Sequence, residues 1–189
     1  MKNRQGRLAK VLSLVVIGTL TVMAFSSLAL AQGAKLLADA AKMMQDGWKQ
    51  FNDGQRMVIK GVEMNNLVAV QGSFESQMAP GNKVIQDGRN TATQGATLIA
   101  QGEKTYLNNK GTPSVAKQGL KIMADGFKIA QDGKEMMKKG IAMNDQVAQT
   151  AGAADKFAQG NQVVQTGMQT MEGGAKLFLQ GEAIFSKLK

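Results

Sequence analysis

The sequence of 189 residues contains neither cysteine nor histidine. Without cysteine the chain has no disulfide, thiol nucleophile or thiolate metal ligand, and without histidine it lacks the commonest general base and zinc ligand. Glycine is abundant, but no Gly-x-Gly-x-x-Gly or Gly-Lys-Ser/Thr arrangement for phosphate binding occurs. We therefore expect a non-enzymatic protein with no catalytic residues, no cofactor and no metal site, whose stability comes from its core alone.

Proline is almost absent as well, which permits long uninterrupted helices. The two prolines are Pro80 and Pro113, and each lies beside or close to a glycine. They predict helix breaks near Pro80 and at residues 111–113, and a further break is predicted around residues 150–152. The sequence therefore predicts four long helices joined by short loops, so that neighbouring helices run antiparallel.

Long apolar runs are missing except at the N-terminus. Four basic residues within positions 1–10 precede an apolar run at residues 11–30, and the small residues Ala29 and Ala31 lie at its end. This order is typical of a secretory signal peptide. We predict that residues 1–31 are a signal peptide cleaved after Ala31, and that the mature protein is periplasmic or extracellular. Polar residues within the run favour cleavage over a membrane anchor, so we expect no stable membrane span afterwards.

The positive charge of the chain is modest and dispersed. The net charge of +9 falls to about +5 when the four basic residues of the signal peptide are removed. The remaining lysines recur at regular intervals instead of forming clusters, as they do on a solvated helix face. Both features argue against a nucleic-acid partner.

The most regular feature of the sequence is a glycine at every seventh residue in four separate runs, the second of which begins at Gly81. A glycine inside a helix costs about 0.5–1 kcal/mol relative to alanine, so the repetition indicates helix backbones that pack unusually close together. With glycine at heptad position a, large apolar residues fall at positions d and e of the same helix face. The predicted structural seam comprises Gly47, Gly54, Gly61, Gly88, Gly95, Gly102, Gly119, Gly126, Gly133, Gly140, Gly160, Gly167, Gly174 and Gly181.

The mature chain also contains an internal duplication. Residues 40–109 align with residues 119–188 without a gap, at an offset of about 79 residues. We therefore predict one helical domain, residues 32–189, made of two repeats of a helical hairpin. A β structure would place adjacent d and e residues on opposite faces of a strand, so helices are favoured despite several Asp-Gly dipeptides. The predicted fold is an all-α four-helix bundle, and its close packing through glycine resembles the Alacoil, in which alanine has the same role.

Helices one and three have a wider apolar arc than helices two and four. Directly after the seam glycines they carry apolar residues, whereas the other two helices carry mainly polar ones. The arc is explained either by deeper burial within the bundle or by a docking surface for a second copy, an extracellular polymer or another exported protein. The residues of this candidate partner surface are Trp48, Val62, Leu120, Phe127 and Ile141.

Two kinds of residue within the seam pattern have alternative interpretations. The 13 methionines fall mostly at apolar positions, where flexible methionine fills gaps in a core, but thioether sulfur is also a ligand for Cu(I). Asn65 and Asn144 are equivalent in the two repeats and occupy the normally apolar e position. We predict that both are polar residues of the core that fix helix register, with a small-ligand site as the alternative.

These observations predict an exported structural or interaction protein that self-associates, or binds another exported protein or polymer, in the cell envelope or extracellular matrix. Two alternatives remain open. One is a methionine-rich, Cu(I)-binding periplasmic protein, and the other is a helical bundle that opens on membranes or other surfaces.

Overall fold

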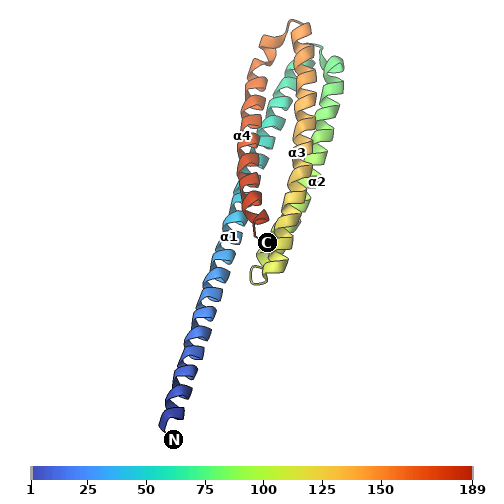
Figure 1. Ribbon diagram of the computed structural model, residues 1–189. Coiled ribbons are helices and arrows are strands. Elements are labelled where there is room, and N and C mark those ends of the chain that lie inside the picture. The colour runs from blue at the N-terminus through green and yellow to red at the C-terminus, as the bar shows by residue number, and fades with distance from the viewer. Residues whose placement is uncertain (1, 189) are drawn as a thin grey trace.

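The structure, a computed structural model, describes residues 2–188, with side chains from residue 31 onward. Residues 2–188 contain no strand, and their helices form the predicted all-α four-helix bundle (Figure 1). The predicted signal peptide, residues 1–31, lies outside the described side chains except for Ala31. The helices are α1 (Lys2–Gln71), α2 (Glu75–Asn108), α3 (Pro113–Thr150) and α4 (Ala154–Ser186).

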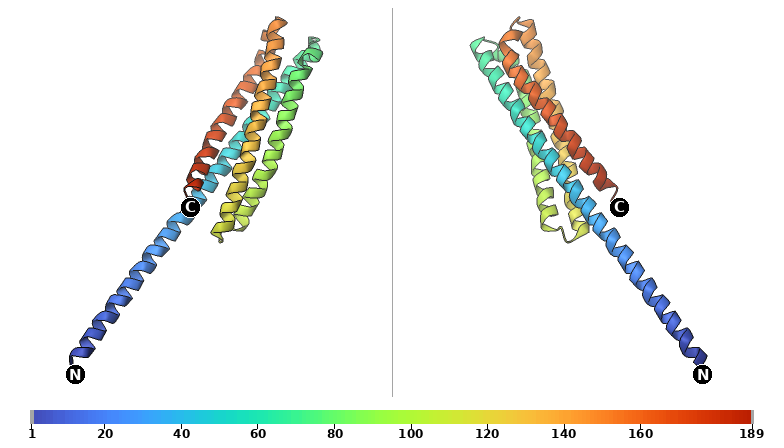
Figure 2. Two further views of the ribbon diagram at one scale, coloured as in Figure 1. Left: turned by 45° about the vertical axis from the view of Figure 1, so that its right-hand side comes forward. Right: turned by 90° about the vertical axis from the view of Figure 1, so that its left-hand side faces the viewer.

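The bundle is built from two tightly packed helix pairs. α1 packs along α4 and α2 packs along α3, whereas α1 with α2 and α3 with α4 make few contacts. The two views of Figure 2 show the pairs lying against each other at an inclination. Because α1 and α2 come from the first repeat and α3 and α4 from the second, each tight pair contains one helix from each repeat.

The first break between helices does not fall at Pro80, as the sequence predicted. It lies at residues 72–74, and Pro80 is inside α2. Pro80 removes the hydrogen bond that the carbonyl of Ser76 would accept and its ring crowds that carbonyl, but Ser76 is an exposed residue near the start of α2, where water can take the place of the lost bond. The other breaks lie at residues 109–112 and 151–153, close to their predicted positions.

The loops after α1 and α3 are equivalent in the two repeats and have the same design. Each contains one residue with a positive φ, 61° at Ser73 and 63° at Gly152. After α1, the N–H of Phe74 donates to the carbonyl oxygen of Ala69 at 2.8 Å, which is the bond that closes a Schellman motif. The equivalent bond after α3 is 2.9 Å long. The repeats therefore share their turn as well as their glycines.

Candidate functional site

The two helices of each pair touch backbone to backbone at the seam glycines. A Cβ atom at Gly54 would lie 2.6 Å from the carbonyl oxygen of Gly167, and one at Gly167 would lie 2.7 Å from the carbonyl oxygen of Gly54. Both distances are far inside van der Waals contact, so neither position has room for a side chain. The reciprocal glycine pairs are Gly47–Gly174, Gly54–Gly167, Gly61–Gly160, Gly81–Gly140, Gly88–Gly133, Gly95–Gly126 and Gly102–Gly119, and Gly181 faces Ala40.

The two helix pairs share one register. In every facing pair of glycines, the two residue numbers add up to the same total. This total is the same in the seam of α1 with α4 as in the seam of α2 with α3. This relation arises when the two repeats are arranged about an approximate two-fold axis, so that α1 meets α4 as α3 meets α2. Every glycine of the predicted seam lies at such a contact, and every contact joins the first repeat to the second.

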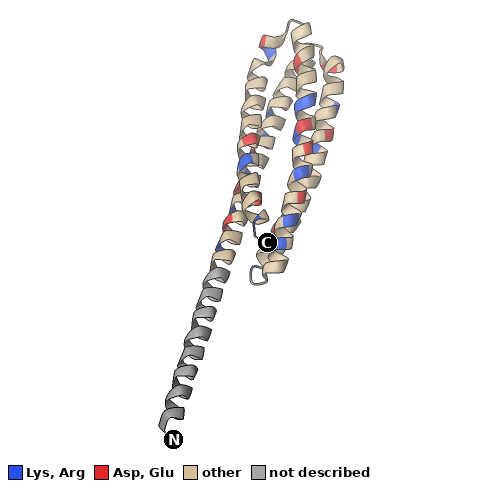
Figure 3. Ribbon diagram, viewed as in Figure 1, with Lys and Arg blue, Asp and Glu red and all other residues tan. Residues whose placement is uncertain are grey.

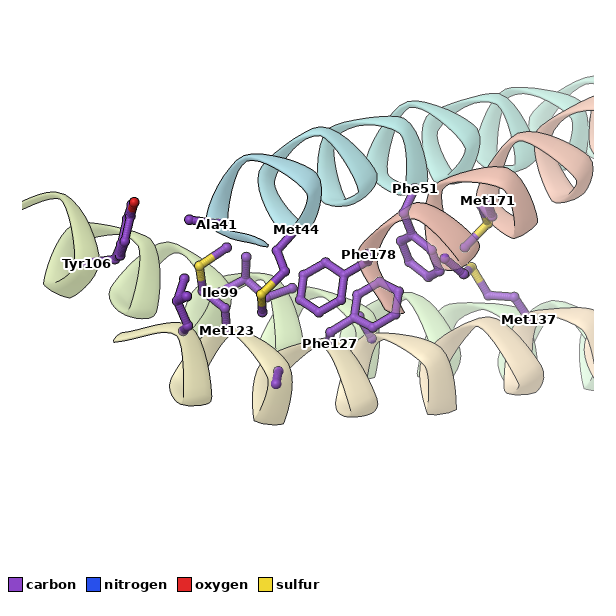
Figure 4. Packing of buried hydrophobic residues seen from close by; sticks show 14 of the residues in the cluster. Ala41, Met44, Phe51, Ile99, Tyr106, Met123, Phe127, Met137, Met171 and Phe178 are labelled. Carbon is purple, nitrogen blue, oxygen red and sulfur yellow. The ribbon is translucent and has the colours of Figure 1, made fainter. Parts of the chain in front are cut away.

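Between the two helix pairs lies a core of buried apolar side chains (Figure 4). Phe127 of α3 stacks on Phe178 of α4 with 3.9 Å between ring centroids, and it meets Phe51 of α1 edge-on at 5.3 Å. Phe51 in turn stacks on Trp48, with 5.7 Å between their ring centroids. Aromatic side chains bury large apolar areas and prefer particular geometries, so this cluster fixes how one helix pair sits on the other.

The residues of the candidate partner surface lie at this core, where two of them are buried and three are partly buried. Leu120 is 0% exposed and Phe127 is 1% exposed. Trp48, Val62 and Ile141 are partly buried against the same core. Burial within the bundle therefore explains the apolar arc at Leu120 and Phe127, whereas Trp48, Val62 and Ile141 keep part of their surface exposed. The physical reason is that α1 and α3 meet between the two pairs, where Val62 and Ile141 line one small, partly open hollow.

Asn65 and Asn144 are placed within the bundle, where each bonds to an asparagine of the other repeat. Nδ2 of Asn65 donates to Oδ1 of Asn161 at 2.6 Å, and Nδ2 of Asn144 donates to Oδ1 of Asn82 at 2.8 Å. The Oδ1 atoms of Asn65 and Asn144 accept no hydrogen bond and lie against seam glycines of the facing helix. A shift in helix register would break both bonds at a cost of about 1–3 kcal/mol for each buried group left unpaired. The arrangement therefore suits a register-fixing role.

The carboxylate of Asp145 lies next to the Asn65–Asn161 contact. It accepts a hydrogen bond from Asn161, while its burial raises the pKa of the carboxyl and outweighs the opposite effect of that bond. The equivalent position of the first repeat is Asn66, whose buried Oδ1 has no hydrogen-bond partner. The two halves of the interior thus differ in charge at this point. We refer to Asn65, Asn66, Asn82, Asn144, Asp145 and Asn161 as the polar layer.

The polar layer offers little acid–base chemistry. Asp145 is its one titratable member, and general acid–base catalysis needs a second group that exchanges a proton with the substrate or orients the first. Two surface grooves adjoin the layer, one of about 360 Å³ beside Asn144 and one of about 350 Å³ beside Asn66. The first is lined by uncharged residues, and the second has Glu63 and Arg89 at its exposed edge. The layer can thus hold helices in register and accept hydrogen bonds.

The methionines are distributed along the core. Met44, Met123, Met137 and Met171 are buried among apolar side chains, as Figure 4 shows. Such positions suit methionine, because its flexible chain fills irregular gaps. Within the part of the chain that the structure describes, no group of three His, Cys, Asp or Glu residues is arranged to hold a metal ion.

The outer faces of the bundle are polar and of mixed charge. Figure 3 shows lysine and arginine interspersed with aspartate and glutamate along the helices. The ion pair between Lys121 and Asp125, with 3.0 Å between the charged atoms, is a typical exposed example. In the described residues, no helix has the combination of length and apolar character that a bilayer span needs.

Comparisons with protein-family models, with curated proteins and with solved structures give no match. The chain itself offers two glycine seams, an aromatic core and the polar layer, all of which join one repeat to the other. Sequence reasoning assigned the seam, Asn65 and Asn144, but it assigned no role to Asn66 or Asp145. The available signal was the repeat alignment, which places an amide opposite a carboxylate at these two positions.

Proposed function

We propose that this protein is an exported, non-enzymatic structural or interaction protein that self-associates. The observation that carries the proposal is that the close contacts in the interior of the bundle hold the two repeats together. The seams, the Phe51–Phe127 contact and both asparagine bonds link the first repeat to the second. The carboxyl of Asp145 lies with asparagines, which supply neither a proton nor a nucleophile.

Export is supported by the N-terminal sequence, and the predicted cleavage site lies outside the two repeats. Ala31 and Gln32 are exposed, and Leu37 is the first buried residue of α1 among the described side chains. The predicted cleavage site therefore lies at exposed residues, N-terminal to the first repeat. The mature domain, residues 32–189, keeps both repeats and both seams.

The test is native mass spectrometry of the mature protein recovered from the envelope and medium of cells that express it. We expect an N-terminus at Gln32 and, at high protein concentration, a mass of two or more chains without bound metal. A mass of one chain at every protein concentration measured would contradict self-association, and an N-terminus at Met1 would contradict export.

The same spectra test the copper alternative. A stoichiometric copper ion that is lost when Met136 and Met137 are both changed to leucine would favour a methionine-rich metal-binding protein. We expect the double variant to have the mass and the assembly state of the wild type, because Met137 is buried in the core and leucine has a similar volume.

A further inference from the structure

The outer surface of the bundle has little apolar area for self-association. Among the described side chains, five large apolar residues are exposed, and they are spread over α1, α2 and α4. Leu67 and Val70 alone lie one turn apart on one helix face. A stable interface buries about 800 Å² on each partner, which is far more than two such side chains supply. The exposed residues are Leu36, Leu67, Val70, Leu107 and Leu179.

The extensive apolar surface of this chain lies between its two repeats. Both glycine seams and both asparagine bonds cross from one repeat to the other, whereas the two helices of a single repeat make few contacts. The helices of each repeat are therefore held mainly by the other repeat, and a repeat without that partner exposes the apolar faces of both its helices. The partner that fits this surface is the other repeat of the same sequence.

One loop is the covalent link between the repeats. Residues 109–112 join α2 to α3, and Lys110, Gly111 and Thr112 are exposed. The loop is closed by the N–H of Thr112, which donates to the carbonyl oxygen of Asn109 at 2.9 Å. Opening the loop separates the repeats without changing any contact within a repeat. A second copy opened in the same way presents the same surfaces.

The aromatic core favours pairing between unlike repeats. Phe51 of the first repeat packs edge-on against Phe127, which stacks on Phe178 within the second repeat. At the positions of Phe127 and Phe178, the first repeat has Trp48 and Ile99 instead. Two first repeats would therefore lack the Phe127–Phe178 stack that receives Phe51. The correct partner for a first repeat is a second repeat, from its own chain or from another copy.

We propose that this protein self-associates by exchanging whole repeats, so that α1 and α2 of one copy pair with α3 and α4 of a second copy. This inference rests on the proposed function, since it specifies the surface through which the chain self-associates. Every contact of the closed chain recurs in the exchanged assembly, and the loop at residues 109–112 alone differs. A short linker gives an effective concentration on the order of 1 mM, so exchange competes with closure as the chain concentration approaches that value.

The experiment refolds the mature protein at about 1 mM, the effective concentration expected for a short linker, and measures its native mass before and after limited trypsin treatment. Lys110 lies in the exposed loop, whereas the other described lysines and arginines lie in helices, apart from Lys187 near the C-terminus. We expect a mass of two or more chains before cleavage. After cleavage at Lys110 the mass should fall to that of one chain, because the loop is then the sole connection between neighbouring bundles. The Lys110→Gln variant is the matched control and should keep its assembled mass in trypsin.

Two results would overturn the inference, and they differ in what they say of the proposed function. If the assembled mass persists after the loop is cut, the copies associate through outer surfaces, so that exchange is wrong while self-association stands. If a single chain is found before cleavage, both proposals fail. Deletion of Lys110 and Gly111 gives an independent measurement, because a shortened loop hinders closure and should lower the concentration needed for assembly at least tenfold. An unchanged concentration dependence in that variant would also contradict exchange.

Discussion

Ser73 and Gly152 occupy the same position in the two repeats, and both have a left-handed backbone, with φ of 61° and 63°. The conformation is nearly free of cost for glycine, whereas it costs another residue about 1–2 kcal/mol because Cβ approaches the following carbonyl oxygen. The turn after α1 therefore carries strain that the turn after α3 does not. Because the two loops differ in this strain but share their backbone conformation, a substitution in one loop can be compared with the reverse substitution in the other.

Ser73→Gly should raise the free energy of unfolding by about 0.5–1 kcal/mol, which is the relief of strain less the entropy that glycine adds to the unfolded chain. Urea denaturation followed by circular dichroism measures this change. Gly152→Ser introduces the same strain into the second repeat and should lower stability by a similar amount. A destabilised Ser73→Gly variant would show that the serine side chain contributes more than its backbone conformation costs.

Neighbouring glycines of α4 provide a matched test of the seam. A Cβ atom at Gly174 would lie 2.6 Å from the carbonyl oxygen of Gly47, whereas one at Gly173 would meet the far end of the long side chain of Gln50. Gly174→Ala should therefore lower the free energy of unfolding by about 1–3 kcal/mol through overpacking. Gly173→Ala should raise it by about 0.5–1 kcal/mol, because alanine is the better helix former. Equal effects of the two substitutions in thermal unfolding would mean that the seam is not close-packed.

The helix breaks show which parts of the fold a local pattern can predict. Pro113 marks the start of α3, because proline is well tolerated in the first helical turn. Pro80 has the same local appearance but lies within α2, and the actual break is set by Ser73. Serine at that position gives no local signal of a left-handed backbone. Alignment with Gly152 in the second repeat would have identified the turn.

Heptad spacing allowed the positions of the seam glycines to be predicted, but it does not determine which helices pack together. Glycine at every seventh residue falls on one helix face whichever helix covers it, so the seam could be assigned without knowing which helices pair. The pairing of α1 with α4 depends on contacts distant in sequence and could not be assigned. For the same reason, the apolar arc containing Phe127 looks alike whether a partner protein or another helix covers it. The structure shows that helices of the same chain cover it.

Asp145 gives stability a specific dependence on pH. Burial raises the pKa of its carboxyl in the folded protein, so the folded state binds its proton more tightly than the unfolded state does. The contribution of this group is therefore most favourable below the ordinary pKa of aspartate, about 3.9, and is lost as the pH rises through the raised pKa of the folded state.

Asp145→Asn introduces the amide that the first repeat has at Asn66, and it keeps an oxygen that can accept the hydrogen bond from Asn161. At pH 7 the variant should unfold at a higher urea concentration than the wild type. The difference should shrink as the pH is lowered toward about 4, near the ordinary aspartate pKa, where the carboxyl of the wild type becomes neutral. Asp125→Asn, at an exposed carboxylate of α3, is the control for a change in net charge. A difference between Asp145→Asn and wild type that is constant with pH would contradict a raised pKa.

Substitution of Phe127 tests whether this residue supports the core of the bundle or binds a partner. Phe127 is buried between Phe51 and Phe178, so Phe127→Ala should lower the free energy of unfolding by about 3–5 kcal/mol. Phe127→Leu keeps much of the volume and should cost less, which makes it the control for the loss of aromatic geometry alone. Both are measured by urea denaturation at a protein concentration where the wild type is a single chain, because any contribution from a partner is then absent. If Phe127→Ala were as stable as the wild type under those conditions, the ring would not support the interior of the bundle. A loss of stability in the isolated chain shows instead that the side chain holds the two helix pairs together.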